Sequence, residues 1–224
     1  MIQRFGSMSG VCGFLLVASC LQGCMSFSSL QHPRPMKPGT WSYGAGFGFQ
    51  APDILESENS RPVIEGFGRY GVIKGMDLGL KHSPMGTTSI DMKQALYGSG
   101  TLSLSTGFGV AYAGYRNPDS AEEIGQSFNS TEIHVPVYSG WEPKSWMVVY
   151  MTPRFVQRFL RYETNGEAKN QQTPIFGYSL GMIFGTSWGI GLEYSNYRSF
   201  GANQDRGGVR QLMAAFIIGL ENVD

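Results

Sequence analysis

Six charged residues in the middle of the chain could do chemistry if they share one face of a sheet. In residues 75–81 and 89–97 the charges alternate with apolar residues, and a strand sends alternate side chains to opposite faces. Charges gathered in this way could form a polar pathway for solutes or a catalytic carboxylate cluster. They could also form a ladder of ion pairs, because buried charges must be paired. The six residues are Glu65, Arg69, Asp77, Lys81, Asp91 and Lys93.

The expected hairpin registers favour the ladder of ion pairs. With a tight turn between the first two strands, antiparallel pairing sets Arg69 opposite Asp77 and Glu65 opposite Lys81. The next loop brings Lys81 near Asp91. Directly opposed Cβ atoms lie about 4.5–5.5 Å apart, which is close enough for ion pairs. The six formal charges cancel, so the sequence predicts a charged scaffold inside the protein and not an active site.

Other reactive side chains are few and isolated. After residue 38 the only histidines are His82 and His134, and neither has an Asp beside it in the sequence. There is no Cys after Cys24, which excludes a Cys-based metal site in the body of the protein. The glycines Gly44, Gly46 and Gly48 alternate at strand period and precede no helix, unlike a phosphate-binding loop. We therefore expect no enzyme, no metal site and no cofactor.

Cys24 suggests chemistry of another kind. Residues 11–21 form an apolar stretch of signal-peptide length that ends in Leu21-Gln22-Gly23-Cys24. This motif resembles the lipobox of bacterial lipoproteins. The resemblance implies that residues 1–23 are a signal peptide and that Cys24 is diacylated as the mature N-terminus. Cys20 fits the same pattern and remains an alternative. Met25, where inner-membrane lipoproteins carry Asp, implies the outer membrane. Residues 24–38, which include three prolines, are then an acylated N-terminus with an extended tether.

The stretch 100–115 predicts the structure of the remaining chain. One face of this stretch is apolar and the opposite face carries Ser, Gly and Ala. The alternation persists for about the 9–11 residues that a tilted strand needs to cross a bilayer. The apolar face consists of Leu102, Leu104, Thr106, Phe108, Val110 and Tyr112.

Similar alternation recurs along residues 39–221, which we interpret as one domain. About ten strands are predicted, with eight as the alternative. Short turns follow the even-numbered strands and longer polar loops follow the odd-numbered ones, as in barrels of bacterial outer membranes. The predicted strands are 40–50, 61–72, 75–81, 89–97, 100–115, 131–141, 145–162, 174–185, 188–197 and 209–220.

Aromatic residues indicate the same orientation. Four tryptophans lie at the short-turn end of the predicted strands and four tyrosines at the long-loop end, as expected for two girdles at membrane interfaces. An even strand count places both termini in the periplasm, where a lipid on Cys24 could enter the membrane. The residues are Trp41, Trp141, Trp146, Trp188, Tyr112, Tyr115, Tyr194 and Tyr197.

The pattern as a whole resembles the small outer-membrane β-barrel proteins. The resemblance implies an all-β, antiparallel, up-and-down transmembrane β-barrel with outer-membrane lipids as its surroundings. A soluble β-sandwich or a lipocalin-like barrel shows the same alternation and is the alternative fold. The formal net charge of zero gives no basic surface for nucleic acid. We expect a structural or surface-interaction role in the bacterial outer membrane, with a narrow pore as the second interpretation and a barrel hydrolase as the third.

Overall fold

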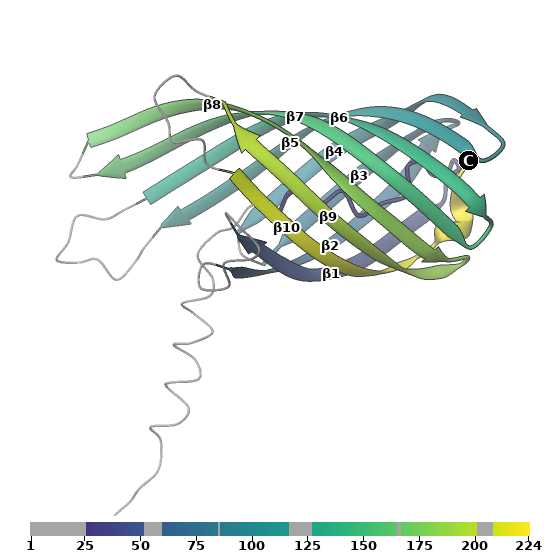
Figure 1. Ribbon diagram of the computed structural model, residues 1–224. Helices are drawn as coiled ribbons and strands as arrows, with labels where there is room; N and C mark the ends of the chain where they lie inside the picture. The colour runs from purple at the N-terminus through teal and green to yellow at the C-terminus, as the bar shows by residue number, and fades with distance from the viewer. Residues whose placement is uncertain (1–25, 52–59, 85, 117–126, 165–166, 201–207) are drawn as a thin grey trace, which may run out of the picture.

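The computed structural model describes residues 26–51, 60–84, 86–116, 127–164, 167–200 and 208–224. Ten antiparallel strands close into one barrel (Figure 1), so the predicted all-β barrel is confirmed with ten strands and not eight. Within the described ranges the chain forms no helix that is long and apolar enough to cross a membrane. The elements are β1 (Trp41–Ala51), β2 (Arg61–Ile73), β3 (Met76–Ser83), β4 (Thr87–Ser99), β5 (Leu102–Arg116), β6 (Ser127–Lys144), β7 (Met147–Thr164), β8 (Glu167–Gly185), β9 (Trp188–Ser199), β10 (Gly208–Ile218) and the short 3-10 helix η2 (Leu220–Asn222).

Pairing of the first strand with the last closes the barrel. Tyr43 lies opposite Ile218 and Ala51 lies opposite Arg210. Every other strand pairs with its neighbours in sequence, so the sheet closes on itself and has no edge strand. We call the end with the connections after β1, β3, β5, β7 and β9 the loop end, and the opposite end the turn end.

Large apolar side chains point away from the barrel, and small or polar ones point into it. On β5, Phe108 and Val110 are exposed, whereas Ser103 and Ser105 are buried. The alternation of the sequence produces this arrangement directly, because successive side chains of a strand face opposite sides. A soluble barrel of this size would need its large apolar residues inside, to fill its core.

The rim at the loop end is uneven. β6 and β7 have 18 residues each and β8 has 19, but β1 and β10 have only 11. β7 and β8 therefore project beyond the neighbouring part of the rim (Figure 1). The sequence predicted a polar loop over residues 163–173, but pairing continues from Arg158–Thr173 to Thr164–Glu167. The polarity of these residues did not distinguish a strand outside an apolar environment from a loop.

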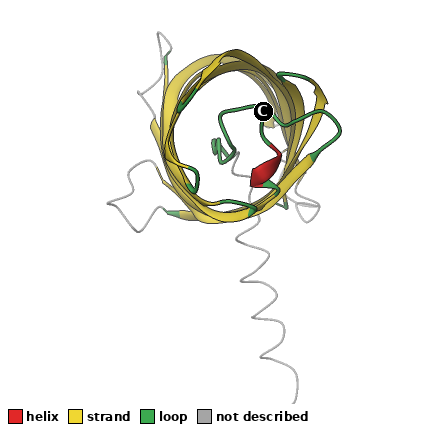
Figure 2. Ribbon diagram, turned by 90° about the vertical axis from the view of Figure 1, so that its right-hand side faces the viewer, coloured by secondary structure: helices red, strands yellow, loops and turns green. Residues whose placement is uncertain are grey.

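The chain enters β1 at the turn end through a tight contact with β2. Gly39 N donates to Gly71 O at 2.8 Å, and Gly71 N donates to Thr40 O at 3.0 Å. Lys37 N donates to Asn222 O at 2.6 Å, so the C-terminal residues hold the same segment. The residues before Lys37 continue inside the barrel, where Figure 2 shows a loop within the ring of strands.

This entry point predicts a specific effect of enlarging Gly71. A Cβ at this position would lie 2.0 Å from Lys37 O and 2.7 Å from Met36 O, and backbone atoms cannot easily move away. Gly71→Ala should therefore lower the free energy of unfolding by about 1–3 kcal/mol, as overpacking does. The readout is the urea midpoint of the detergent-folded protein.

Gly68→Ala is the matched control, because the nearest atom to its Cβ would be Ser42 O at 3.8 Å. Equal midpoints for the two variants would show that the chain does not pack against β2 in this way.

Candidate functional site

Residues 26–36, which we call the lumen segment, run through the interior of the barrel. Phe27, Leu30, His32 and Met36 on this segment are all less than a tenth exposed. The sequence suggested an extended tether for residues 24–38. The segment lacks regular secondary structure, as that prediction implied, but its described residues lie inside the barrel and not beside it (Figure 2).

Near the turn end, charged side chains of the barrel wall bind the backbone of the lumen segment. Met36 N donates to Asp77 Oδ2 at 2.9 Å. Lys93 Nζ donates to the His32 carbonyl oxygen at 2.6 Å. Lys93 and Asp77 are almost fully buried, so the segment supplies polar partners that water would otherwise have to supply.

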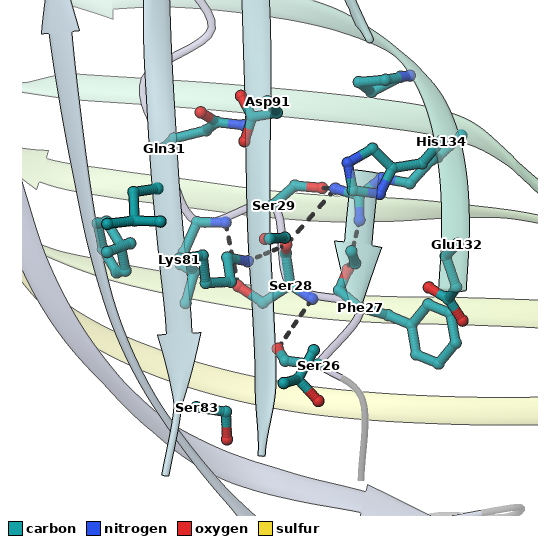
Figure 3. A pocket seen from close by; sticks show the side chains of 18 of the residues that line it. Ser26, Phe27, Ser28, Ser29, Gln31, Lys81, Ser83, Asp91, Glu132 and His134 are labelled. Carbon is teal, nitrogen blue, oxygen red and sulfur yellow. Dashed lines mark hydrogen bonds between the residues drawn. The ribbon is translucent and has the colours of Figure 1, made fainter. Parts of the chain in front are cut away.

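In the middle of the barrel, side chains of β3, β7 and β9 bind the segment in the same way (Figure 3). Ser29 N donates to the two carboxylate oxygens of Glu193 at 2.7 and 3.0 Å. Lys81 Nζ donates to the Ser28 carbonyl oxygen at 2.5 Å, and the Arg154 guanidinium donates to Ser29 Oγ. The carboxylate of the wall thus accepts a hydrogen bond from a backbone N–H of the segment, while the cations of the wall donate to oxygen atoms of the segment.

The part of the segment nearest the loop end is held by hydrogen bonds and by ring stacking. Phe27 N donates to Gln211 Oε1 at 2.9 Å, and the Phe27 ring stacks on Tyr197 with centroids 4.6 Å apart. Ser26 Oγ and Ser28 Oγ both donate to the Glu65 carboxylate.

Leu30 packs into an apolar cluster on another side of the lumen. The cluster contains residues of β7, β8 and β10, among them Val148, Ile183, Met213 and Ile217. The lumen therefore has a charged side, mainly on β2–β4, and an apolar side. The backbone of the segment forms hydrogen bonds with the charged side, and Leu30 packs against the apolar side.

All six charged residues singled out by the sequence point into the lumen and form ion pairs. Arg69 lies 2.5 Å from Asp77 and 2.7 Å from Asp91. Lys93 lies 3.5 Å from Asp77. The expected pair of Lys81 with Glu65 is present at 3.5 Å.

The pairing differs from the expected one in register. Arg69 lies opposite Gly79 and not opposite Asp77, so its ion pairs run diagonally across the strands. Because Gly79 has no side chain, the guanidinium can lie across it; a Cβ there would be 2.3 Å from Arg69 Nη1. This diagonal position brings Arg69 close to Asp91. The sequence had predicted Lys81 as the neighbour of Asp91.

Several residues that hold the segment were not identified as site residues from the sequence. β9 and β10 carry few charges, so a single inward polar residue there forms no conspicuous cluster, and on β7 Arg154 is one of three arginines. The alternation of β9 does predict that Glu193 faces inward, but it gives no hint of a partner. The missed residues are Arg154, Glu193, Gln211 and Tyr150, the last of which donates to Glu193 at 2.8 Å.

Most of the aromatic residues predicted to form the girdles point outward, and one points inward. All four tryptophans and Tyr112 are more than half exposed on the outer face. Tyr194 also points outward, but Tyr197 is only 1% exposed and lies in the lumen against Phe27. Tyr194 and Tyr197 are three positions apart, so on a strand they must face opposite sides. The side chain of Tyr115 lies outside the described residues.

Two small cavities lie beside the described part of the lumen segment. A cavity of about 40 Å³ lies between the segment and Asp91, His134 and Arg154 (Figure 3). A second cavity, near His32 and Met36, has a volume of about 10 Å³. One water needs roughly 10–15 Å³ of such space, so the two cavities hold a few waters at most. In the described part of the chain, no three His, Cys or acidic residues are grouped as a metal site would require.

His32 contributes both its backbone and its side chain to the packing of the lumen segment: its carbonyl oxygen accepts from Lys93 Nζ, and its side chain is buried. His32 Nδ1 accepts a hydrogen bond from Arg34 N at 3.1 Å.

No protein-family model and no curated protein matches the chain. Solved structures with similar folds include Neisserial surface protein A, at 11% identity over 80% of this chain and 96% of that one, with a TM-score of 0.43. Ail of Yersinia pestis is 11% identical over 81% of this chain and 100% of its own, with a TM-score of 0.42. The outer-membrane protease OmpT of Escherichia coli is 9% identical over 80% and 91%, with a TM-score of 0.44. At such identities the function has to be argued from this chain's own residues.

The buried ion pairs predict strong sensitivity at Asp77. Asp77→Ala would leave Lys93 without its carboxylate and Met36 N without an acceptor. Breaking one side of a buried pair typically costs about 3–5 kcal/mol of stability, and we expect a loss of this size in the urea midpoint.

The matched control is Glu142→Gln, which removes an ion pair with Arg34 at the partly exposed barrel mouth. That change should cost about 1 kcal/mol or less. An Asp77→Ala midpoint no lower than that of the control would contradict a structural role for the charge cluster.

Proposed function

We propose that the protein is a lipoprotein barrel of the bacterial outer membrane whose lumen is closed by its own N-terminal segment. Its role is structural or surface-interacting, and neither transport nor catalysis. The observation that carries the proposal is the lumen segment itself, which occupies the interior that a pore or an active site would need.

The outer surface supports a membrane environment. Exposed Phe, Leu, Ile and Val side chains cover the outward face of the strands. Outward tryptophans lie toward the turn end, and closed barrels satisfy all backbone hydrogen bonds between strands. These features fit a barrel of bacterial outer-membrane type, with membrane lipids as its neighbours.

The filled lumen argues against the two alternative functions. The two cavities beside the described segment, of about 40 and 10 Å³, are too small to form a water-filled channel for ions. The carboxylates of Asp77, Glu65 and Glu193 each accept a hydrogen bond from the lumen segment. Groups committed in this way hold a segment in place and are not free to act on a substrate.

The lipid part of the proposal rests on the motif that ends in Cys24. In the lipidation step the Cys24 sulfur bonds to the glycerol carbon of a membrane phospholipid. The carbon–oxygen bond to the phosphate headgroup breaks, and the thiol proton leaves with that headgroup. Water then hydrolyses the Gly23–Cys24 peptide bond and releases residues 1–23. Two acyl chains give the stable anchoring that one chain does not.

The membrane environment predicts a depth-dependent effect of charge on the outer face. Phe108 lies in the middle of β5 and is half exposed. Phe108→Arg should destabilise the protein by about 2–4 kcal/mol in lipid vesicles, as expected near the bilayer midplane. Urea titration of folding into vesicles measures it.

Leu102→Arg is the control, since Leu102 has the same outward facing and similar exposure at the turn end of the same strand. It should cost about 0–1 kcal/mol. Equal effects of the two substitutions would argue that β5 does not cross a bilayer.

A closed lumen also predicts how the barrel behaves in planar bilayers. The mature protein should show no steady conductance, whereas deletion of residues 26–36 should open a cation- or anion-conducting path through the polar interior. The heat-dependent gel mobility of folded barrels checks that each protein is folded. Steady conductance of the folded, undeleted protein would overturn the closed-lumen proposal in favour of a pore.

A further inference from the structure

The lumen segment crosses the barrel with its first residues toward the loop end and its last residues at the turn end. Its contacts with β3 show the direction, since Met36 binds Asp77 near the start of that strand and Ser28 binds Lys81 four residues further on. β3 begins at the turn end and ends at Ser83 at the loop end. Descending residue numbers in the segment therefore lead toward the loop end.

The first described residue lies close to the loop-end rim. Ser26 is hydrogen-bonded to Glu65 and Gln211. Gln211 is three residues from the loop-end start of β10 at Gly208. Three strand residues cover about 10 Å along a strand, or roughly 8 Å along the axis of a barrel with ordinary strand tilt.

The rim is low on this side of the barrel. β1, β2 and β10, which surround Ser26, end at Ala51, Arg61 and Gly208, while β7 and β8 project further (Figure 1). Cys24 precedes Ser26 by two residues, and two extended residues reach about 7 Å. That reach is comparable with the distance from Ser26 to the rim. The wall between Cys24 and the surrounding membrane is lowest on this side.

We infer that the mature N-terminus leaves the barrel at the loop end, so that the acyl chains on Cys24 enter the membrane leaflet at that end. The inference rests on the lipidation and the loop-out orientation of the proposed function. It places the lipid anchor on the cell-surface side and the C-terminus on the periplasmic side. The sequence had suggested that both termini lie in the periplasm.

This arrangement constrains assembly. A diacylglycerol is far larger than the spaces of about 40 and 10 Å³ left beside the segment, so it could not be drawn through a closed barrel. The β1–β10 seam therefore closes around the segment. The C-terminal residues then hold the segment at the turn end, where Asp224 N donates to Pro35 O at 2.9 Å.

Labelling of single cysteines on whole cells tests the inference. The variants are Met25→Cys at the N-terminus, Asp224→Cys at the C-terminus and Ala121→Cys in the connection between β5 and β6. A membrane-impermeant maleimide is applied to intact and to permeabilised cells. The thioether at a lipidated Cys24 cannot react, so each variant reports one position.

We expect Met25→Cys to react on intact cells together with Ala121→Cys, and Asp224→Cys to react only after permeabilisation. Reaction of Met25→Cys under the same condition as Asp224→Cys, with Ala121→Cys under the other, would overturn the inference. An epitope inserted between Met25 and Ser26, detected by antibody on intact cells, decides the same question if the Met25→Cys thiol is shielded in the barrel.

Failures of the proposed function give different results. Labelling of the unsubstituted protein would show a free cysteine thiol and would refute the lipidation of Cys24. Ala121→Cys reacting only after permeabilisation would reverse the orientation of the barrel. In both cases the inference is still tested by whether Met25→Cys and Ala121→Cys react under the same condition. If Cys24 is not lipidated, this comparison is made in a Cys24→Ser background.

Discussion

The pairing of charges inside a closed barrel is the constraint on which the structure depends. Strands that put large apolar residues outside must put something else inside. Here one cluster of ion pairs on β2–β4 joins Arg69, Asp77, Asp91 and Lys93. Charges in such an interior are unstable unless each finds a partner. The wall pairs some of them with one another, and the backbone of the lumen segment supplies the remaining partners at Asp77, Lys81 and Lys93.

The same constraint explains why the segment has so little regular structure. A helix would use most of its N–H and C=O groups within itself, and a strand would pair them with a neighbouring strand, which leaves few for the side chains of the wall. An irregular chain with Pro33 and Pro35 presents these groups to the lumen, where Lys93 and Glu193 bind them. The segment thus makes the barrel compact and closed, which favours a role at the membrane surface over a role in passage through it.

Side-chain alternation was enough to predict the ten strands, the inward facing of the six charges and the outward tryptophans, because each depends only on a period of two. The position of the lumen segment could not be predicted, because its partners bind mainly backbone atoms and backbone atoms are the same in every sequence. Tyr197 was wrongly predicted to join the girdle: it lies near the end of β9, but it shares the inward face of that strand with Glu193 and Ser195. The extension of β7 and β8 was missed because polar residues there pair as strands outside the apolar band.

Hydrogen exchange of the lumen segment in lipid bilayers tests the central claim most directly. Amides that are buried and hydrogen-bonded exchange only when the structure opens. Phe27, Ser29 and Met36 donate their amide N–H groups to Gln211, Glu193 and Asp77. The structure predicts that peptides covering residues 26–36 are protected to an extent comparable with those from β9. Exchange of these peptides as fast as that of an unfolded peptide, with the strands still protected, would contradict a barrel filled by its own N-terminal segment.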